Sequence, residues 1–117
     1  MARETIATMN HNQLFAGEVG HIVRVPVSGA TIKVGDVLEG TVASGVVATT
    51  FKKATTDAKA GNVYVIAAED VTDYTGEVVA YADGYFDDSQ VRINDAPLTE
   101  ASKLALMASK IFAITTN

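Results

Sequence analysis

The chain has 117 residues, a formal net charge of −5, no cysteine and no tryptophan. A chain of this length forms one domain that buries roughly 65% of its unfolded surface. The missing cysteines exclude disulfides, thiolate nucleophiles and Cys-based zinc sites. An acidic body repels phosphates, which argues against a nucleic-acid partner. No apolar run approaches the ~20 residues that cross a bilayer, so we expect a soluble protein with no membrane partner.

The first 15 residues predict an extended arm. Met1 to Gln13 has few bulky apolar side chains, a polar cluster at positions 10–13 and no periodic pattern. Such a segment is disordered alone or becomes ordered against a partner. The alternative is a terminus without a role. We therefore divide the chain into an arm at 1–15 and a single β-rich domain at 16–117.

From Gly20 onward the pattern predicts β-structure. Residues 22–27 alternate partly, and Pro26 indicates a sheet edge or the end of the strand. The Val- and Thr-rich stretch 41–51 predicts a hairpin, and the polar stretch 52–61 predicts a mobile connection. The elements expected between them are a turn at 28–30, a strand at 31–34, a tight turn at 35–36 and a strand at 37–39.

The second half begins with two apolar strands, at 63–66 and 76–81, around an acidic turn at Glu69-Asp70. A Gly-aromatic segment, Asp83-Gly84-Tyr85-Phe86, follows the second strand. A short helical turn is expected at 87–91 and a last strand at 111–114. Together with the helix described next, these elements predict an α+β, mostly β fold: a small β-rich sandwich or barrel-like domain with one main C-terminal helix and an extended N-terminal arm.

One helix is expected near the C-terminus. Thr99 is a favourable N-cap, Glu100 suits the positive end of the helix dipole, and Pro97 lies just ahead. Three- and four-residue spacing then gives one apolar stripe. We expect this stripe to pack on the strands at 63–66 and 78–81; its members are Leu104, Met107, Ala108 and Ile111.

No residue pattern indicates catalysis or a cofactor. His11 and His21 lack a third metal ligand, so they are expected to be surface histidines. No serine lies in a Gly-x-Ser-x-Gly elbow, and no glycine run leads into a helix start to cradle a phosphate. The acidic residues lack the spacing of a calcium loop and are expected to be solvated turn residues: Glu69, Asp70, Asp73, Asp87 and Asp88. The sequence therefore predicts a protein that is not an enzyme, with no metal and no cofactor.

The segment Val34-Gly35-Asp36-Val37-Leu38 is similar to a turn of the barrel-sandwich domains that carry biotin or lipoate. Those domains present a modified lysine at the tip of a separate hairpin, and they have no place for a long C-terminal helix. None of the lysines here lies in such a tip: Lys33, Lys52, Lys53, Lys59, Lys103 and Lys110. A biotinyl- or lipoyl-like carrier domain remains an alternative.

The order of elements over residues 63–115 is strand, turn, strand, Gly-aromatic segment, short helix, long helix and last strand. This order resembles the head decoration (capsid cement) proteins of lambda-like tailed phages. The resemblance covers residues 60–115, roughly half of the chain, and is a pattern of residue types. The Gly35-Asp36 turn also fits the family.

The resemblance implies a protein that binds the outer surface of a mature phage head and stabilises the shell. The implied partners are the major capsid protein and two further copies of the chain, forming a homotrimer at local three-fold positions. The implied location is the exterior of the virion, and the host cytoplasm during assembly. The capsid-attached base of a head fibre is a further alternative. The arm residues expected to bind the capsid, partly as an added strand, are Arg3, Glu4, Thr5, Ile6, Ala7, Thr8 and Met9.

Overall fold

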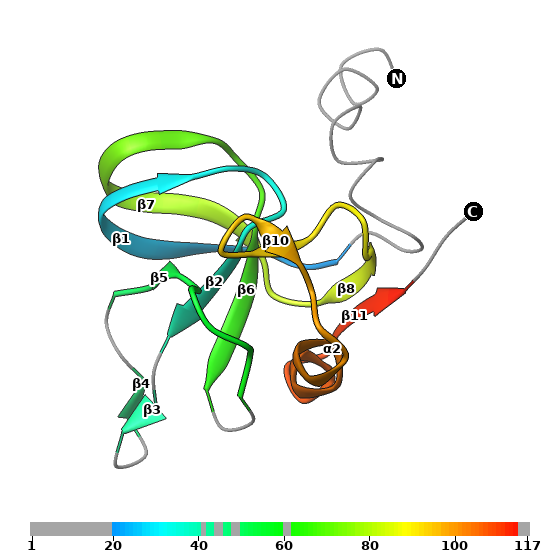
Figure 1. Ribbon diagram of the computed structural model, residues 1–117. Helices are drawn as coiled ribbons and strands as arrows, with labels where there is room; N and C mark the ends of the chain where they lie inside the picture. The colour runs from blue at the N-terminus through cyan, green and yellow to red at the C-terminus, as the bar shows by residue number, and fades with distance from the viewer. Residues whose placement is uncertain (1–19, 41, 44–45, 48–49, 60–61, 115–117) are drawn as a thin grey trace.

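The structure, a computed structural model, describes residues 20–40, 42–43, 46–47, 50–59 and 62–114. The predicted arm at 1–15, with the proposed capsid-binding residues 3–9 and His11, lies outside the described residues. The rest forms a small, mostly β domain with a short C-terminal helix, which confirms the predicted fold class (Figure 1).

Five strands form a nearly closed antiparallel barrel. They are β1 (Ile22–Ile32), β2 (Val37–Gly40), β5 (Lys52–Lys53), β6 (Val63–Ala67) and β7 (Val71–Tyr81), in the order β1-β7-β6-β2-β5. The two edge strands meet where Val27 forms a parallel bridge with Phe51, whose N–H donates to the Pro26 carbonyl at 2.8 Å. Pro26 lacks an N–H, and it is accommodated because it lies in an edge strand of this sheet.

Strands β1 and β7 are longer than the sequence indicated, and the turn predicted at 28–30 is wrong. The chain instead keeps pairing through a bulge: Val27 pairs with Gly76 and Ala30 with Tyr74, which leaves one extra residue in β1. Gly29 absorbs this residue with a φ of 57°, a conformation that glycine adopts without steric cost. A second irregularity, on the β7 side, follows before Ile32, so the two strands twist strongly while staying paired.

Smaller elements surround the barrel. The expected hairpin at 41–51 contains the antiparallel strands β3 (Val42–Ala43) and β4 (Val46–Val47). The segment predicted as a helical turn at 87–91 forms a hydrogen-bonded turn, in which the Gln90 N–H donates to the Asp87 carbonyl at 3.0 Å. Besides β5, the sequence reasoning missed three strands: β8 (Gly84–Asp87), β9 (Arg92–Ile93) and β10 (Ala96–Pro97).

The β9–β10 hairpin had a usable signal. Its two turn residues, Asn94 and Asp95, have φ values of 54° and 60°. Two consecutive positive φ angles are the requirement of a tight type I′ hairpin turn, and Asn and Asp tolerate them better than most residues. The Asn-Asp pair therefore marks a hairpin that a search for longer apolar strands overlooks.

The core has two parts because strand β6 is buried on both faces. Val65 and Ala67 point into the barrel, where they join a cluster that includes Leu38 and Val78. Tyr64 and Ile66 point outward and are covered by the C-terminal elements. The outer cluster consists of Val37, Ala54, Ala58, Tyr64, Ile66, Ala68, Tyr81, Phe86, Val91, Ile93, Leu98, Leu106 and Ile111.

The helix α2 (Glu100–Met107) begins as predicted: the Thr99 side chain accepts a hydrogen bond from the Ser102 N–H. Its buried face, however, is not the predicted stripe. Leu104 is 68% exposed and Met107 48% exposed, whereas Leu106 and Ser102 are fully buried. Of the predicted stripe, only Ile111 is fully buried, and it lies beyond the helix in β11 (Ile111–Ile114).

A satisfied polar residue explains the error. The Ser102 hydroxyl accepts from the Ala58 N–H at 3.0 Å and donates to the Asp57 carboxylate at 3.2 Å, so serine is buried at little cost. The Thr99 hydroxyl donates to the same carboxylate at 3.0 Å. Apolar periodicity alone cannot reveal a helix face whose centre is a hydroxyl.

The segment predicted as a mobile connection, 52–61, also differs from expectation over its described part. Lys52–Lys53 form the fifth barrel strand, and Ala54 and Ala58 are buried in the outer core. The Ala54 N–H donates to the Val37 carbonyl at 2.9 Å. Small side chains make this loop a close cover for the barrel. Within the described ranges, no helix has the length and apolar character needed to cross a bilayer.

Candidate functional site

The described chain enters the barrel at a tightly held point. A Cβ atom on Gly20 would lie 1.5 Å from the backbone oxygen of Asp83, so only glycine fits there without a shift of the backbone. The His21 N–H donates to the Asp83 carboxylate at 2.9 Å, and the Ala82 N–H donates to the His21 carbonyl at 2.8 Å. These contacts form an entry clamp that fixes where the segment preceding Gly20 leaves the domain.

The clamp contains a His–Asp pair, yet its geometry is that of a surface contact. The His21 Nδ1 lies 2.9 Å from the Asp83 carboxylate, and the imidazole is 87% exposed. The hydrogen bond from the His21 backbone N–H, followed by that from its side chain, lowers the pKa of Asp83 below the usual 3.8. The adjoining pocket is lined by no Ser, Thr or Cys among the described residues, and the hydroxyl in its lining is the phenol of Tyr85, so no aliphatic hydroxyl or thiol is placed for the pair to activate.

This pocket lies beside the entry clamp and has a volume of about 240 Å³. Ligand cavities of soluble proteins are mostly larger, roughly 300–1,000 Å³, so the pocket suits a single side chain better than a cofactor. It is lined by Gly20, His21, Asp83, Gly84, Tyr85, Lys110 and Phe112.

An apolar sheet face continues from the pocket. Strands β8 and β11 pair in parallel, with Phe112 opposite Tyr85, and their rings stack with centroids 4.9 Å apart. Because strand side chains alternate, Phe86, Ile111 and Ala113 point to the core while Tyr85, Phe112 and Ile114 point away from it. Tyr85 is 46% exposed, Ile114 is 40% exposed and Phe112 is half-buried. We call these three residues the aromatic face.

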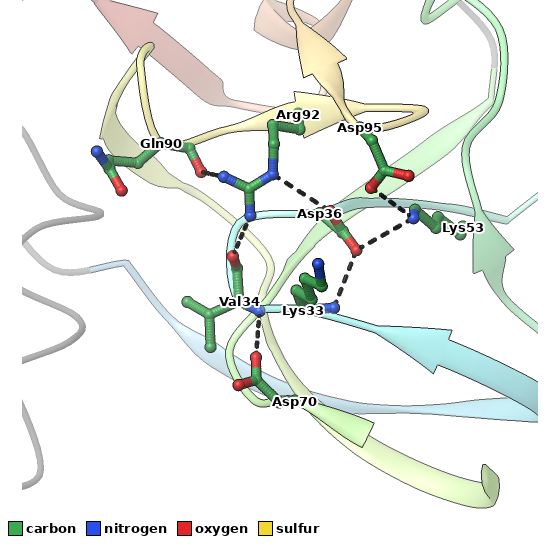
Figure 2. A network of polar contacts seen from close by, with 8 residues as sticks. All are labelled: Lys33, Val34, Asp36, Lys53, Asp70, Gln90, Arg92 and Asp95. Atoms are coloured by element: carbon green, nitrogen blue, oxygen red, sulfur yellow. Dashed lines mark hydrogen bonds and ion pairs between the residues drawn. The ribbon is translucent and has the colours of Figure 1, made fainter. Parts of the chain in front are cut away.

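A second polar cluster surrounds Asp36, at the predicted Gly35-Asp36 turn (Figure 2). The fully buried Asp36 carboxylate accepts from the Lys33 N–H at 2.9 Å and lies 3.7 Å from both the Lys53 Nζ and the Arg92 Nε. Its Oδ1 atom makes no hydrogen bond. A buried carboxylate without its cations would be costly, so these partners are needed for the fold.

The cations of this cluster tie separate elements together. Arg92 donates to the Val34 carbonyl at 2.8 Å, which fastens the β9–β10 hairpin to the Gly35-Asp36 turn (Figure 2). Lys53 donates to the Asp95 carboxylate at 2.9 Å, and this hydrogen bond raises the pKa of Lys53. Position 35 requires glycine for two reasons. Its φ is 97°, and a Cβ atom there would lie 2.1 Å from the Gln90 carbonyl oxygen. The cluster is therefore structural.

The acidic residues considered from sequence do not converge. Glu69 accepts from the Val79 N–H at 2.9 Å, and Asp70 accepts from the Val34 N–H at 2.8 Å. Asp87 accepts from the Ser89 N–H at 3.0 Å, Asp88 pairs with Lys103 at 2.9 Å, and Asp73 lies in the irregular part of β7. Over the described ranges, no three His, Cys, Asp or Glu side chains gather where they could hold a metal ion.

The sequence reasoning found Gly84, Tyr85 and the last strand, but it did not pair them into one face. No signal in the sequence indicated that β8 and β11, separated by a hairpin and a helix, would lie in parallel. Comparison with known proteins adds no further assignment: no family model, no curated protein and no solved structure matches this chain.

Proposed function

We propose that the protein is a capsid decoration protein of the kind found on lambda-like tailed phages. It binds the outer surface of the mature head through the major capsid protein, as a homotrimer at local three-fold positions, and stabilises the shell. It has no enzymatic activity and needs no cofactor. It acts on the exterior of the virion and is present in the host cytoplasm during assembly.

The observation that carries the proposal is the entry clamp beside the aromatic face. Residues 1–19, which include the arm proposed to bind the capsid, join the domain at a point fixed by Gly20 and Asp83. A partner held by the arm is therefore brought to one particular side of the domain. Over residues 63–114 the chain has the two strands, the Gly-aromatic segment, a helix and the last strand of the resemblance, but a turn and the β9–β10 hairpin lie where the short helix was expected.

The mechanism follows from small binding contributions that are linked. One small domain contacts too little shell to remain attached alone, but three linked copies raise the effective concentration of each contact. The arm adds a strand to an exposed sheet edge of the capsid, where backbone hydrogen bonds supply affinity. Ordering the arm costs ~1–2 kcal/mol per residue, which those contacts must exceed.

The mass of the purified protein in solution, measured with and without empty heads of the phage that encodes it, tests the proposal. We expect a trimer and saturable co-sedimentation with the heads. A monomer that never co-sediments, or a covalent biotin or lipoyl adduct on native material, would refute it. An adduct would favour the carrier-domain alternative, in which a lysine is modified.

A further inference from the structure

We propose that the aromatic face is a second attachment surface, separate from the arm, that docks directly on the shell protein. The inference rests on the proposed function, because it takes the shell as the partner. It assigns to Tyr85, Phe112 and Ile114 the role of seating the domain once the arm is bound.

The first argument is that, in the part of the chain that the structure describes, no element covers this sheet face. The inward side chains of β8 and β11, such as Phe86 and Ile111, are fully buried against the helix and barrel. The outward side chains remain in contact with solvent although two of them are aromatic and stack on each other. Exposed aromatic residues grouped beside a hollow are typical of a binding surface, since burying them yields much apolar area at little entropic cost.

The second argument is the place where the chain outside the described part begins. Gly20 and His21 line the same pocket as Tyr85 and Phe112. Nineteen residues precede Gly20, and the clamp to Asp83 sets their point of departure at the rim of the aromatic face. Whatever the first residues of the arm bind is thereby held at high effective concentration near that face.

The third argument concerns the chemistry of the partner. The pocket offers two ring surfaces, from Tyr85 and Phe112. Lys110 lies at its edge, where its charge adds to the hydrogen bonds from His21 in lowering the pKa of Asp83. Asp83 is occupied by His21. The site therefore fits an apolar side chain of the shell protein, which the two rings would cover.

The test replaces Tyr85 by alanine and compares the variant with Tyr74→Ala. Tyr74 is the matched control because it is a similarly exposed tyrosine (38%) in the part of β7 that pairs with Ala30 of β1, and it does not line the pocket of the aromatic face. Ile114→Ala is a second variant at the aromatic face. For each protein the affinity for empty heads, the solution mass and the melting temperature are measured on the full chain.

We expect Tyr85→Ala to weaken head binding at least tenfold, as truncation of an aromatic anchor does. Ile114→Ala should also weaken head binding, but by a smaller factor. Tyr74→Ala should bind like the unmodified chain, and all variants should keep their mass and melting temperature. Unchanged binding by both face variants overturns the inference while leaving the proposed function intact. Failure of the unmodified chain to bind heads overturns the proposed function itself.

Two other occupants of the face would be revealed by the same measurements. If Tyr85→Ala changes the solution mass from trimer to monomer, a second copy of the chain covers the face. If it lowers the melting temperature strongly without affecting head binding, residues 14–19 of the same chain cover it. Either result overturns docking on the shell.

Discussion

The orientation of helix α2 makes a sharp prediction, because two leucines two positions apart have opposite environments. Leu106 is fully buried against the outer core, whereas Leu104 on the same helix is largely exposed. Replacing each by alanine is chemically the same change, and alanine slightly favours the helix in both cases. Any difference in stability therefore reports burial.

The expected magnitude follows from the cavity that Leu106→Ala leaves. Removing a fully buried leucine side chain costs about 2–5 kcal/mol, through lost transfer free energy and lost packing contacts. We expect a value near 3 kcal/mol, since Leu106 has no exposed surface through which water could fill the space. For a domain of this size that corresponds to a fall of about 10–15 °C in the melting temperature. Leu104→Ala should change stability by less than about 0.5 kcal/mol.

Urea unfolding followed by circular dichroism at low protein concentration measures both variants, and the slope of each transition shows whether the folded state is otherwise unchanged. The reasoning would be refuted by a Leu104→Ala variant as unstable as Leu106→Ala. Such a result would mean that the helix buries the stripe of Leu104 and Met107 after all.

The remaining predictions concern the polar clusters and the arm. Asp36→Ala should lower the free energy of unfolding by about 2–4 kcal/mol, because it leaves two cations and the Lys33 N–H without their shared acceptor. Urea unfolding checks this, and Asp95→Ala, which removes an exposed partner of Lys53, should destabilise the protein much less than Asp36→Ala. The lowered pKa of Asp83 stabilises the fold at pH values above its unfolded pKa of 3.8 and loses this effect as the pH falls through the folded pKa. Melting temperatures of Asp83→Asn should therefore lie below those of the unmodified chain at neutral pH and converge with them as the pH falls through the folded pKa of Asp83. A constant gap would contradict the assigned cause. Deleting Met1–Gln13 should leave the melting curve nearly unchanged and weaken head binding strongly. A truncated chain that binds heads as tightly as the full chain would show that the arm does not bind the capsid.

Local signals predicted the elements that depend on local chemistry. The Thr99 cap, the Gly35-Asp36 turn and the apolar strands around Glu69-Asp70 are all present. Each depends on residues that are neighbours in the sequence: a hydroxyl beside free N–H groups, a glycine with positive φ, or a run of β-branched side chains. Such features need no knowledge of what packs against them.

The failures involve residues that are distant in the sequence. The turn predicted at 28–30 became a bulge because β7 was available to continue the pairing. The buried helix face was missed because Asp57 and Ala58, more than forty positions away, satisfy Ser102. The aromatic face depends on the parallel pairing of β8 with β11. Contacts of this kind override local propensity. They cannot be predicted from the periodicity of a single sequence, because the residues involved are far apart in the chain.

The central claim, attachment to the shell at local three-fold positions, is tested most directly by the ratio of bound protein to major capsid protein on saturated heads. Three copies at each point where three shell subunits meet give one bound copy per shell subunit. Quantitative gel densitometry or native mass measurement of saturated, washed heads should therefore approach a one-to-one ratio. A saturated ratio far below one, such as a single bound assembly per capsomer, would contradict trimer decoration and favour the base of a head fibre; heads that bind none of the protein would contradict capsid attachment altogether.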